Sequence, residues 1–248
     1  MKKISIVFIL MVLSTAVFAQ EARNIFFDTP KKEKEKYVFT TSWRIAASYV
    51  QDWQKSNSTY PDTYLHGGKI GASVDFSLPY HMSLQTGVNY ALTGNYNNQH
   101  WRSISAETTQ EEYIHHQLLK HTLEIPVHLY YNQQLWKQLR LFFLTGPNFQ
   151  IGLAYSDNIT NNLSDGAKNW LEKNGLFTEK YDKYKEKELY RFNFQWTVGG
   201  GLEWDKYRIF GTYNFGLNNL VNNYPHNSTS FSAQMREWSW SAGFAICL

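Results

Sequence analysis

Hydrophobic and polar residues alternate with a period of two along several segments of the chain. In residues 82–92 (MSLQTGVNYAL), the even-numbered positions from 84 onward are Leu, Thr, Val, Tyr and Leu, and the odd-numbered positions are Ser, Gln, Gly, Asn and Ala. Successive side chains of a β-strand point to opposite faces, so this pattern predicts a strand with one apolar and one polar face. The apolar face must contact either a protein core or lipid.

The same period identifies eight candidate strands. They cover residues 38–50, 66–78, 82–94, 115–131, 139–155, 190–204, 207–218 and 234–248. The links between them are short at 79–81, 132–138 and 205–206, and long and polar at 51–65, 95–114, 156–189 and 219–233. Short turns at one end and long loops at the other are typical of an outer-membrane barrel, whose even strand number places both termini at the periplasmic end. We therefore predict an all-β fold, an eight-stranded antiparallel up-and-down transmembrane β-barrel.

The composition of the two strand faces favours lipid over a soluble core. A soluble lipocalin-like barrel would carry many Lys and Glu residues on its outside, whereas here the polar positions are mostly Gly, Ser, Asn, Gln and Thr. Small side chains suit the narrow interior of an eight-stranded barrel. The apolar face is almost free of charge and has aromatic residues near the strand ends, as in interfacial girdles. The expected girdle residues are Trp43, Tyr49, Tyr131, Tyr155, Trp204, Tyr207 and Trp238.

The few charged residues within the strands fall on the polar, inward positions. They are Arg44, Lys69, Asp75, Lys120, Glu124, Arg140, Arg191, Glu203 and Arg208. Both signs occur, and ions in a poorly hydrated interior are tolerated only when they are paired. We predict an ion-pair network that runs through the barrel interior; the alternative is that the charges near the rims are simply solvated.

The N-terminus has the features of a bacterial secretory signal. Lys2 and Lys3 precede an apolar run at 4–13, and the segment 16–19 (AVFA) ends in a small residue. The run is shorter than the ~20 residues of a transmembrane helix. We expect a cleaved signal peptide at 1–19, a periplasmic leader at 20–36 and an outer-membrane barrel at 37–248.

Charge and cysteine content exclude several classes of function. Without Lys2 and Lys3 the chain has 22 basic and 21 acidic residues, so no basic excess indicates binding to nucleic acid. The single cysteine, Cys247, excludes an internal disulfide and makes no metal site by itself. We expect no cofactor, and outer-membrane lipid is the first expected partner.

Two groups of residues are candidates for chemistry. His115, His116, His121 and His128 resemble a metal cluster, but residues four apart on a strand are separated by ~13 Å, and His121 has the opposite parity to His116 and His128. We therefore expect no metal site. A segment at 226–228 (HNS) is the nearest candidate for a lipid hydrolase or acyltransferase, but no acidic partner can be assigned to it, so we expect no catalytic residues.

Three segments resemble a known family. They are HTLEIPVHLYY (121–131), TGPNFQIGLAY (145–155) and VGGGLEWDKYRIFGTYNFGLNNL (198–220). Together they look like the PorT-like outer-membrane β-barrel family of Bacteroidota, which carries an L-E-I-P strand, a G-P-x-x strand and a G-x-G-x-E hairpin. The resemblance covers about residues 36–248 and implies the barrel fold. It also implies a link to protein secretion, because the family's namesake is a component of that machinery.

Two local features complete the prediction. Pro126 and Pro147 lie inside candidate strands, where proline removes a ladder hydrogen bond, so we expect a bulge at each. The loop 156–189 contains a segment at 165–173 with the pattern of a short amphipathic helix.

Three functions fit this architecture. The favoured one is a non-enzymatic envelope protein that acts through its external loops or within a larger outer-membrane complex with protein partners. The alternatives are a narrow small-solute channel and a lipid-modifying enzyme.

Overall fold

The computed structural model describes residues 38–56, 62–105, 108–161, 165–173, 180–222 and 234–248. The expected signal peptide at 1–19 and leader at 20–36 lie outside this described part. The elements run in the order β1 (Thr41–Ser56), β2 (Thr63–Leu78), β3 (Met82–Ser105), β4 (Thr108–Gln134), β5 (Leu139–Asn161), α2 (Asp165–Lys173), β6 (Lys180–Asp182), β7 (Phe192–Trp204), β8 (Tyr207–Gly216) and β9 (Met235–Cys247). The short helix predicted at 165–173 is confirmed.

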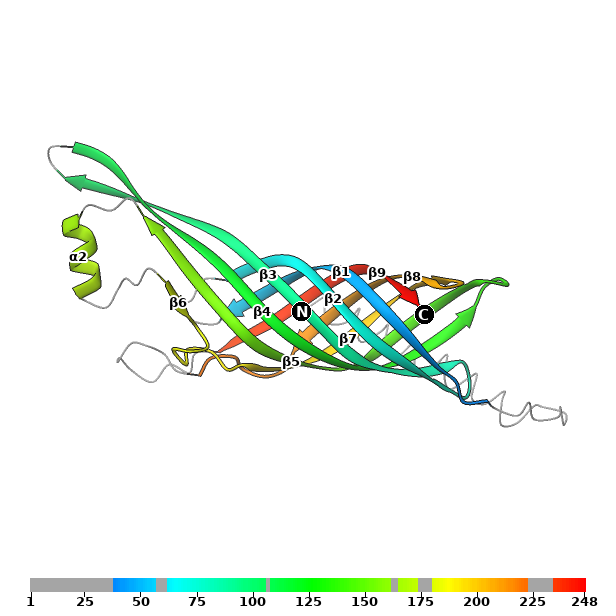
Figure 1. Cartoon of the computed structure of the whole chain (residues 1–248). Coiled ribbons are helices and arrows are strands. Elements are labelled where there is room, and N and C mark those ends of the chain that lie inside the picture. The colour runs from blue at the N-terminus through cyan, green and yellow to red at the C-terminus, as the bar shows by residue number, and fades with distance from the viewer. Residues whose placement is uncertain (1–37, 57–61, 106–107, 162–164, 174–179, 223–233) are drawn as a thin grey trace, which may run out of the picture. The chain divides into compact units, whose positions relative to one another are not determined.

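Eight of these strands form a closed antiparallel barrel (Figure 1). Neighbours along the chain pair with each other, β5 pairs with β7, and β1 pairs with β9 to close the ring. The short strand β6 adds to the free edge of β5, where Tyr181 pairs with Asp157. The predicted eight-stranded barrel is confirmed. Among the described residues, no helix is long and apolar enough to cross a membrane.

The barrel is polar inside and apolar outside. Ile70 and Ile209, on the outward face, are 62% and 63% exposed, whereas Gln195 and Glu237, on the inward face, are fully buried. A water-soluble protein has the opposite distribution, because burial of apolar surface drives its folding. This outer surface is suited to contact with acyl chains.

The connections between strands are short at one end of the barrel and long at the other. At one end, called here the turn end, Pro79–His81 and Asp205–Lys206 connect strands directly. At the opposite end, the loop end, β3 and β4 continue as a hairpin (Figure 1). The β2–β3 ladder stops at the pair His66–Gly94, but the β3–β4 ladder continues to Ser105–Thr108. The prediction of a loop at 95–114 is therefore wrong, because strand pairing extends beyond the barrel wall.

The irregularity in the β4–β5 ladder does not lie at the prolines. Register is the same on both sides of Pro126 and Pro147, so the predicted bulges there are wrong. The register shifts instead where His121 pairs with Ala154 and Thr122 pairs with Gly152, which leaves Leu153 as an extra residue of β5. An extra residue in one strand reverses the inside–outside parity of the residues beyond it.

Gly146 allows the two strands to approach closely beside Pro147. Its φ angle is 153°, a value that side chains rarely permit, and an added Cβ would lie 2.2 Å from the carbonyl oxygen of Val127. Because Gly146 has no Cβ, β4 can lie this close to β5, and the register stays the same on both sides of Pro147.

We predict that Gly146→Ala destabilises the folded barrel by ~1–3 kcal/mol, the usual cost of a strained backbone position. Urea unfolding of the protein in detergent micelles would measure the change. Gly68→Ala is the matched control, because an added Cβ there meets no atom within 4 Å. Equal unfolding midpoints for the two variants would contradict the prediction.

Candidate functional site

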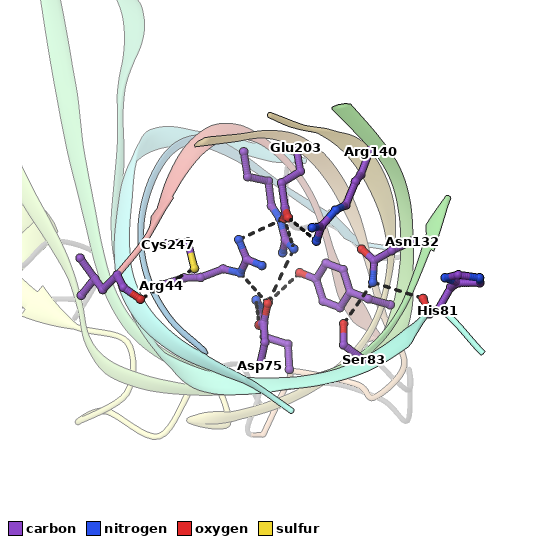
Figure 2. A network of polar contacts seen from close by, with 12 residues as sticks. Arg44, Asp75, His81, Ser83, Asn132, Arg140, Glu203 and Cys247 are labelled. Atoms are coloured by element: carbon purple, nitrogen blue, oxygen red, sulfur yellow. Dashed lines mark hydrogen bonds and ion pairs between the residues drawn. The ribbon is translucent and has the colours of Figure 1, made fainter. Parts of the chain in front are cut away.

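The barrel interior at the turn end contains a cluster of paired charges, the turn-end cluster, formed by Arg44, Asp75, Glu203 and Arg208. The Nε of Arg44 lies 2.5 Å from Asp75 Oδ2, and its Nη1 lies 3.1 Å from Glu203 Oε2. The Nη2 of Arg208 lies 2.7 Å from Glu203 Oε2 and 3.7 Å from Asp75 Oδ2. Figure 2 shows Arg44, Asp75 and Glu203 converging on the barrel interior from different parts of its wall. Arg140, whose side chain is half exposed, approaches Glu203 Oε1 at 3.4 Å.

Neutral side chains hold this cluster in place. Gln85 donates a hydrogen bond to Asp75 Oδ1 at 2.6 Å and accepts one from the Tyr130 hydroxyl at 2.6 Å. The guanidinium of Arg208 lies 4.8 Å from the ring centre of Tyr130 and 4.5 Å from that of Phe142. Buried ions need such additional partners, since pairing alone does not offset the loss of their hydration.

A second group of charges, the loop-end cluster, lies further along the interior and consists of Lys120, Asp52 and Glu237. The Nζ of Lys120 lies 2.5 Å from Glu237 Oε2 and 3.3 Å from Asp52 Oδ2. Gln54 donates a hydrogen bond to the same Glu237 oxygen at 2.8 Å. All of these side chains are almost completely buried.

The sequence analysis missed both acids of the loop-end cluster. Asp52 lies beyond the predicted end of the first strand at residue 50, although it has the same parity as Arg44. Glu237 lies inside the predicted last strand and has the parity of the inward residues Ser239 and Ser241. Extending the first strand by two residues would have identified Asp52, and applying the alternation to the whole predicted last strand would have identified Glu237.

Between the two clusters lies a cavity of about 70 Å³. The ion pair of Lys69 Nζ and Glu124 Oε2, 3.1 Å apart, lines it. Two buried polar atoms of its lining residues, His128 Nε2 and Asn148 Oδ1, have no hydrogen-bond partner in the described part of the chain. A polar cavity of this size has room for a few water molecules that would satisfy such atoms.

An apolar layer, the plug, lies next to the loop-end cluster. Its members are Leu65, Leu118, Tyr155, Tyr184, Leu189, Leu220, Val221 and Met235. Half of them come from the loop-end parts of the barrel strands β2, β4, β5 and β9, and the others lie in the segments after β6 and after β8. Burial raises the pKa of Tyr184 to about 12, so its hydroxyl stays neutral at all physiological pH values. The side chains of the plug therefore cover this side of the lumen with closely packed apolar groups.

Most of the charged residues expected inside the barrel belong to these groups, but not as one continuous network. Arg44, Asp75, Glu203, Arg208 and Arg140 come together, while Lys69–Glu124 and Lys120 are separate from them. Arg191 departs from the expectation: it is exposed and precedes β7. It donates to the carbonyl oxygens of Gly152 and Leu153, and its guanidinium lies 5.3 Å from the ring centre of Tyr184.

Only some of the expected girdle residues face outward and are exposed. The outward-facing and exposed ones are Trp43, Tyr49, Trp204 and Tyr207, and the half-buried ones are Tyr131 and Trp238. Tyr49 lies in the middle of β1, because that strand continues to Ser56.

Tyr155 is not a girdle residue. It is fully buried, and its hydroxyl donates to Gln54 Oε1 at 3.1 Å inside the barrel. The cause is the extra residue Leu153, which reverses the parity of the end of β5 and turns Tyr155 inward.

The described residues do not bring the candidate metal ligands together, and they do not include the candidate nucleophile. His128 faces the lumen, whereas His121 points outward and its Nδ1 lies 2.5 Å from the Tyr90 hydroxyl. In the described part of the chain no three His, Cys, Asp or Glu side chains form a metal-binding group. The side chains of His115 and His116 and the whole segment 226–228 lie outside the description.

Comparison with known proteins places this barrel in a family. The sequence matches the family described as "Outer membrane protein beta-barrel domain" over residues 18–222. The chain belongs to this family. It is therefore an outer-membrane barrel, and in such barrels the short turns face the periplasm and the longer loops face the outside. No curated protein matches the chain.

Several solved outer-membrane structures are similar to this outer-membrane barrel. Neisserial surface protein A (NspA) is 10% identical, with a TM-score of 0.42 and coverage of 84% of this chain and 98% of that one. Ail, the attachment invasion locus protein of Yersinia pestis, is 12% identical, with a TM-score of 0.32 and coverage of 83% and 98%. The N-terminal β-barrel domain of Pseudomonas aeruginosa OprF is 11% identical, with a TM-score of 0.29 and coverage of 82% and 97%.

We predict that Glu203→Gln destabilises this outer-membrane barrel by ~3–5 kcal/mol, because it leaves the two buried cations Arg44 and Arg208 with one shared carboxylate, Asp75, in place of two. Arg140→Gln removes only the half-exposed partner of Glu203 and should cost ~0–1 kcal/mol. Both changes are to be measured by urea unfolding in micelles at neutral pH. A Glu203→Gln variant as stable as the Arg140→Gln variant would show that the cluster does not hold the strands together.

Proposed function

We propose that the protein is a non-enzymatic barrel that acts through its external elements, either directly or as a component of an envelope complex. The observation that carries the proposal is the contrast between the two parts of the molecule. The lumen contains two layers of paired charge and an apolar plug. The β3–β4 hairpin, by contrast, continues to Ser105–Thr108, beyond the last β2–β3 pair at His66–Gly94.

The external hairpin offers the kind of surface that binds other proteins. Beyond Gly94, β3 has no β2 residue beside it, so one side of its backbone is not used in that ladder. Unpaired strand edges bind extended segments of partner chains through main-chain hydrogen bonds. A protein partner at the outer surface is therefore the first expectation.

The resemblance to the PorT-like family of Bacteroidota also supports a role in a complex with protein partners. The L-E-I-P motif at 123–126 lies in β4, and the G-P motif at 146–147 lies in β5, the strand that follows the hairpin. On this basis the complex would be an envelope assembly connected with protein secretion. Export through a signal peptide at 1–19, cleaved after Ala19, belongs to the same proposal.

We predict that shortening the hairpin abolishes partner capture without unfolding the barrel. Residues 97–116 would be replaced by an Asn-Gly turn that joins Tyr96 to Gln117, which are directly paired. Crosslinking in intact cells followed by mass spectrometry would compare partner sets, and heat-modifiable migration on gels would report folding.

A control variant carries a short insertion in the periplasmic turn Asp205–Lys206 and should keep the native partner set. A folded hairpin variant that captures the same partners as the native protein would place the interaction elsewhere and overturn the proposal.

A narrow channel is the second candidate, since the lumen contains a cavity of about 70 Å³. The plug and the two charged layers argue against a channel, because they fill the lumen.

We predict that the purified protein in planar bilayers gives no steady single-channel current in 1 M KCl. Large, steady currents under these conditions would exclude the closed lumen and favour the channel.

A further inference from the structure

Two cations face each other on the outer wall near the external end of the barrel. Lys55 of β1 and Arg236 of β9 are directly paired positions of adjacent strands, and both side chains are exposed. Paired residues have their Cβ atoms ~4.5–5.5 Å apart, where like charges destabilise the sheet. Neither cation forms an ion pair with any acid of the described residues. The arrangement would be stabilised by an anion bound between them.

A cluster of aromatic rings lies directly on the membrane side of these cations. The neighbouring outward pair is Trp53 and Trp238, whose ring centres are 5.3 Å apart at an interplanar angle of 74°. Tyr64 of β2 stacks on Trp53 with the ring centres 5.7 Å apart, and Lys55 Nζ lies 5.9 Å from the Trp53 ring. Trp and Tyr gather at the level of lipid headgroups, because their rings are amphipathic.

The height of the cations relative to these rings matches the headgroup layer. Lys55 and Arg236 are two residues further out than Trp53 and Trp238, a rise of ~6–7 Å along a strand. Rings at the boundary of the hydrocarbon thus place the cations at the depth of the headgroup phosphates.

The surrounding chain supplies little negative charge. The adjoining segments 57–61 (NSTYP) and 223–233 (NYPHNSTSFSA) contain no Asp or Glu. Asp62 is the nearest acid on this face along the sequence, and its Oδ1 accepts a hydrogen bond from the backbone N–H of Ser56 at 3.2 Å. The charge of this patch is therefore complementary to an anionic group.

We propose that Lys55 and Arg236, above the rings of Trp53, Trp238 and Tyr64, bind a phosphate group of lipopolysaccharide in the external leaflet. Guanidinium and ammonium groups form charge-assisted hydrogen bonds with phosphate oxygens, and Arg can do so with two N–H groups at once. The aromatic cluster contacts the adjoining sugar and acyl region. The site lies across the β1–β9 seam that closes the barrel.

The test uses the purified full-length protein in a zwitterionic detergent, titrated with diphosphoryl lipid A and followed by native mass spectrometry. The double variant Lys55→Gln/Arg236→Gln should bind lipid A ~30-fold more weakly, from ~1 kcal/mol for each cation near an anionic lipid surface. The control Lys137→Gln/Lys206→Gln removes the same charge from two exposed residues at the periplasmic turns and should bind as the native protein does. Heat-modifiable migration confirms that each variant is folded.

Two further titrations identify the recognised group. Dephosphorylated lipid A should bind the native protein as weakly as diphosphoryl lipid A binds the double variant, and millimolar inorganic phosphate should not compete. Equal losses in the two double variants, undiminished binding of dephosphorylated lipid A, or competition by inorganic phosphate would each overturn the proposal.

Discussion

The architecture depends on the pairing of the first barrel strand with the last. β1 and β9 are paired from Arg44–Cys247 to Ser56–Met235, so the sheet has no open edge along the barrel wall. In lipid an unpaired backbone N–H or C=O group costs several kcal/mol, and only helices and closed barrels avoid that cost. Once eight strands are closed in this way, the interior has room for little more than their own side chains. The small residues and paired charges of the lumen follow from that limit.

The buried charges also specify how the strands are arranged. Arg44 of β1 meets Glu203 of β7, and Lys120 of β4 meets Glu237 of β9, so the contacts join strands that are distant in sequence. A slip of one residue in any ladder would turn these charges toward lipid and the apolar residues toward the lumen. Such a slip would be far more costly than the loss of a surface ion pair, which contributes little. Interior ion pairs and an apolar exterior therefore select the same register.

Simple alternation in the sequence predicted the eight strands, their facing and the inward direction of most of the charges that it assigned to the lumen, with Arg191 as the exception. It failed where the structure depends on pairing between strands. Tyr155 was assigned to the wrong face because the extra residue Leu153 is defined only relative to β4. The polar residues of 95–114 suggested a loop, although β3 and β4 remain paired there. Asp52 was missed because the end of β1 is set by its partners in β2 and β9.

The composition of the plug has a consequence for the order of assembly. Leu65 and Leu118 lie in β2 and β4, whereas Leu220 and Val221 follow β8 and Met235 begins β9. Met235 is also the β9 residue that pairs with Ser56 at the external end of the closing seam. The plug can therefore be complete only when β9 has paired with β1 at this end of the seam.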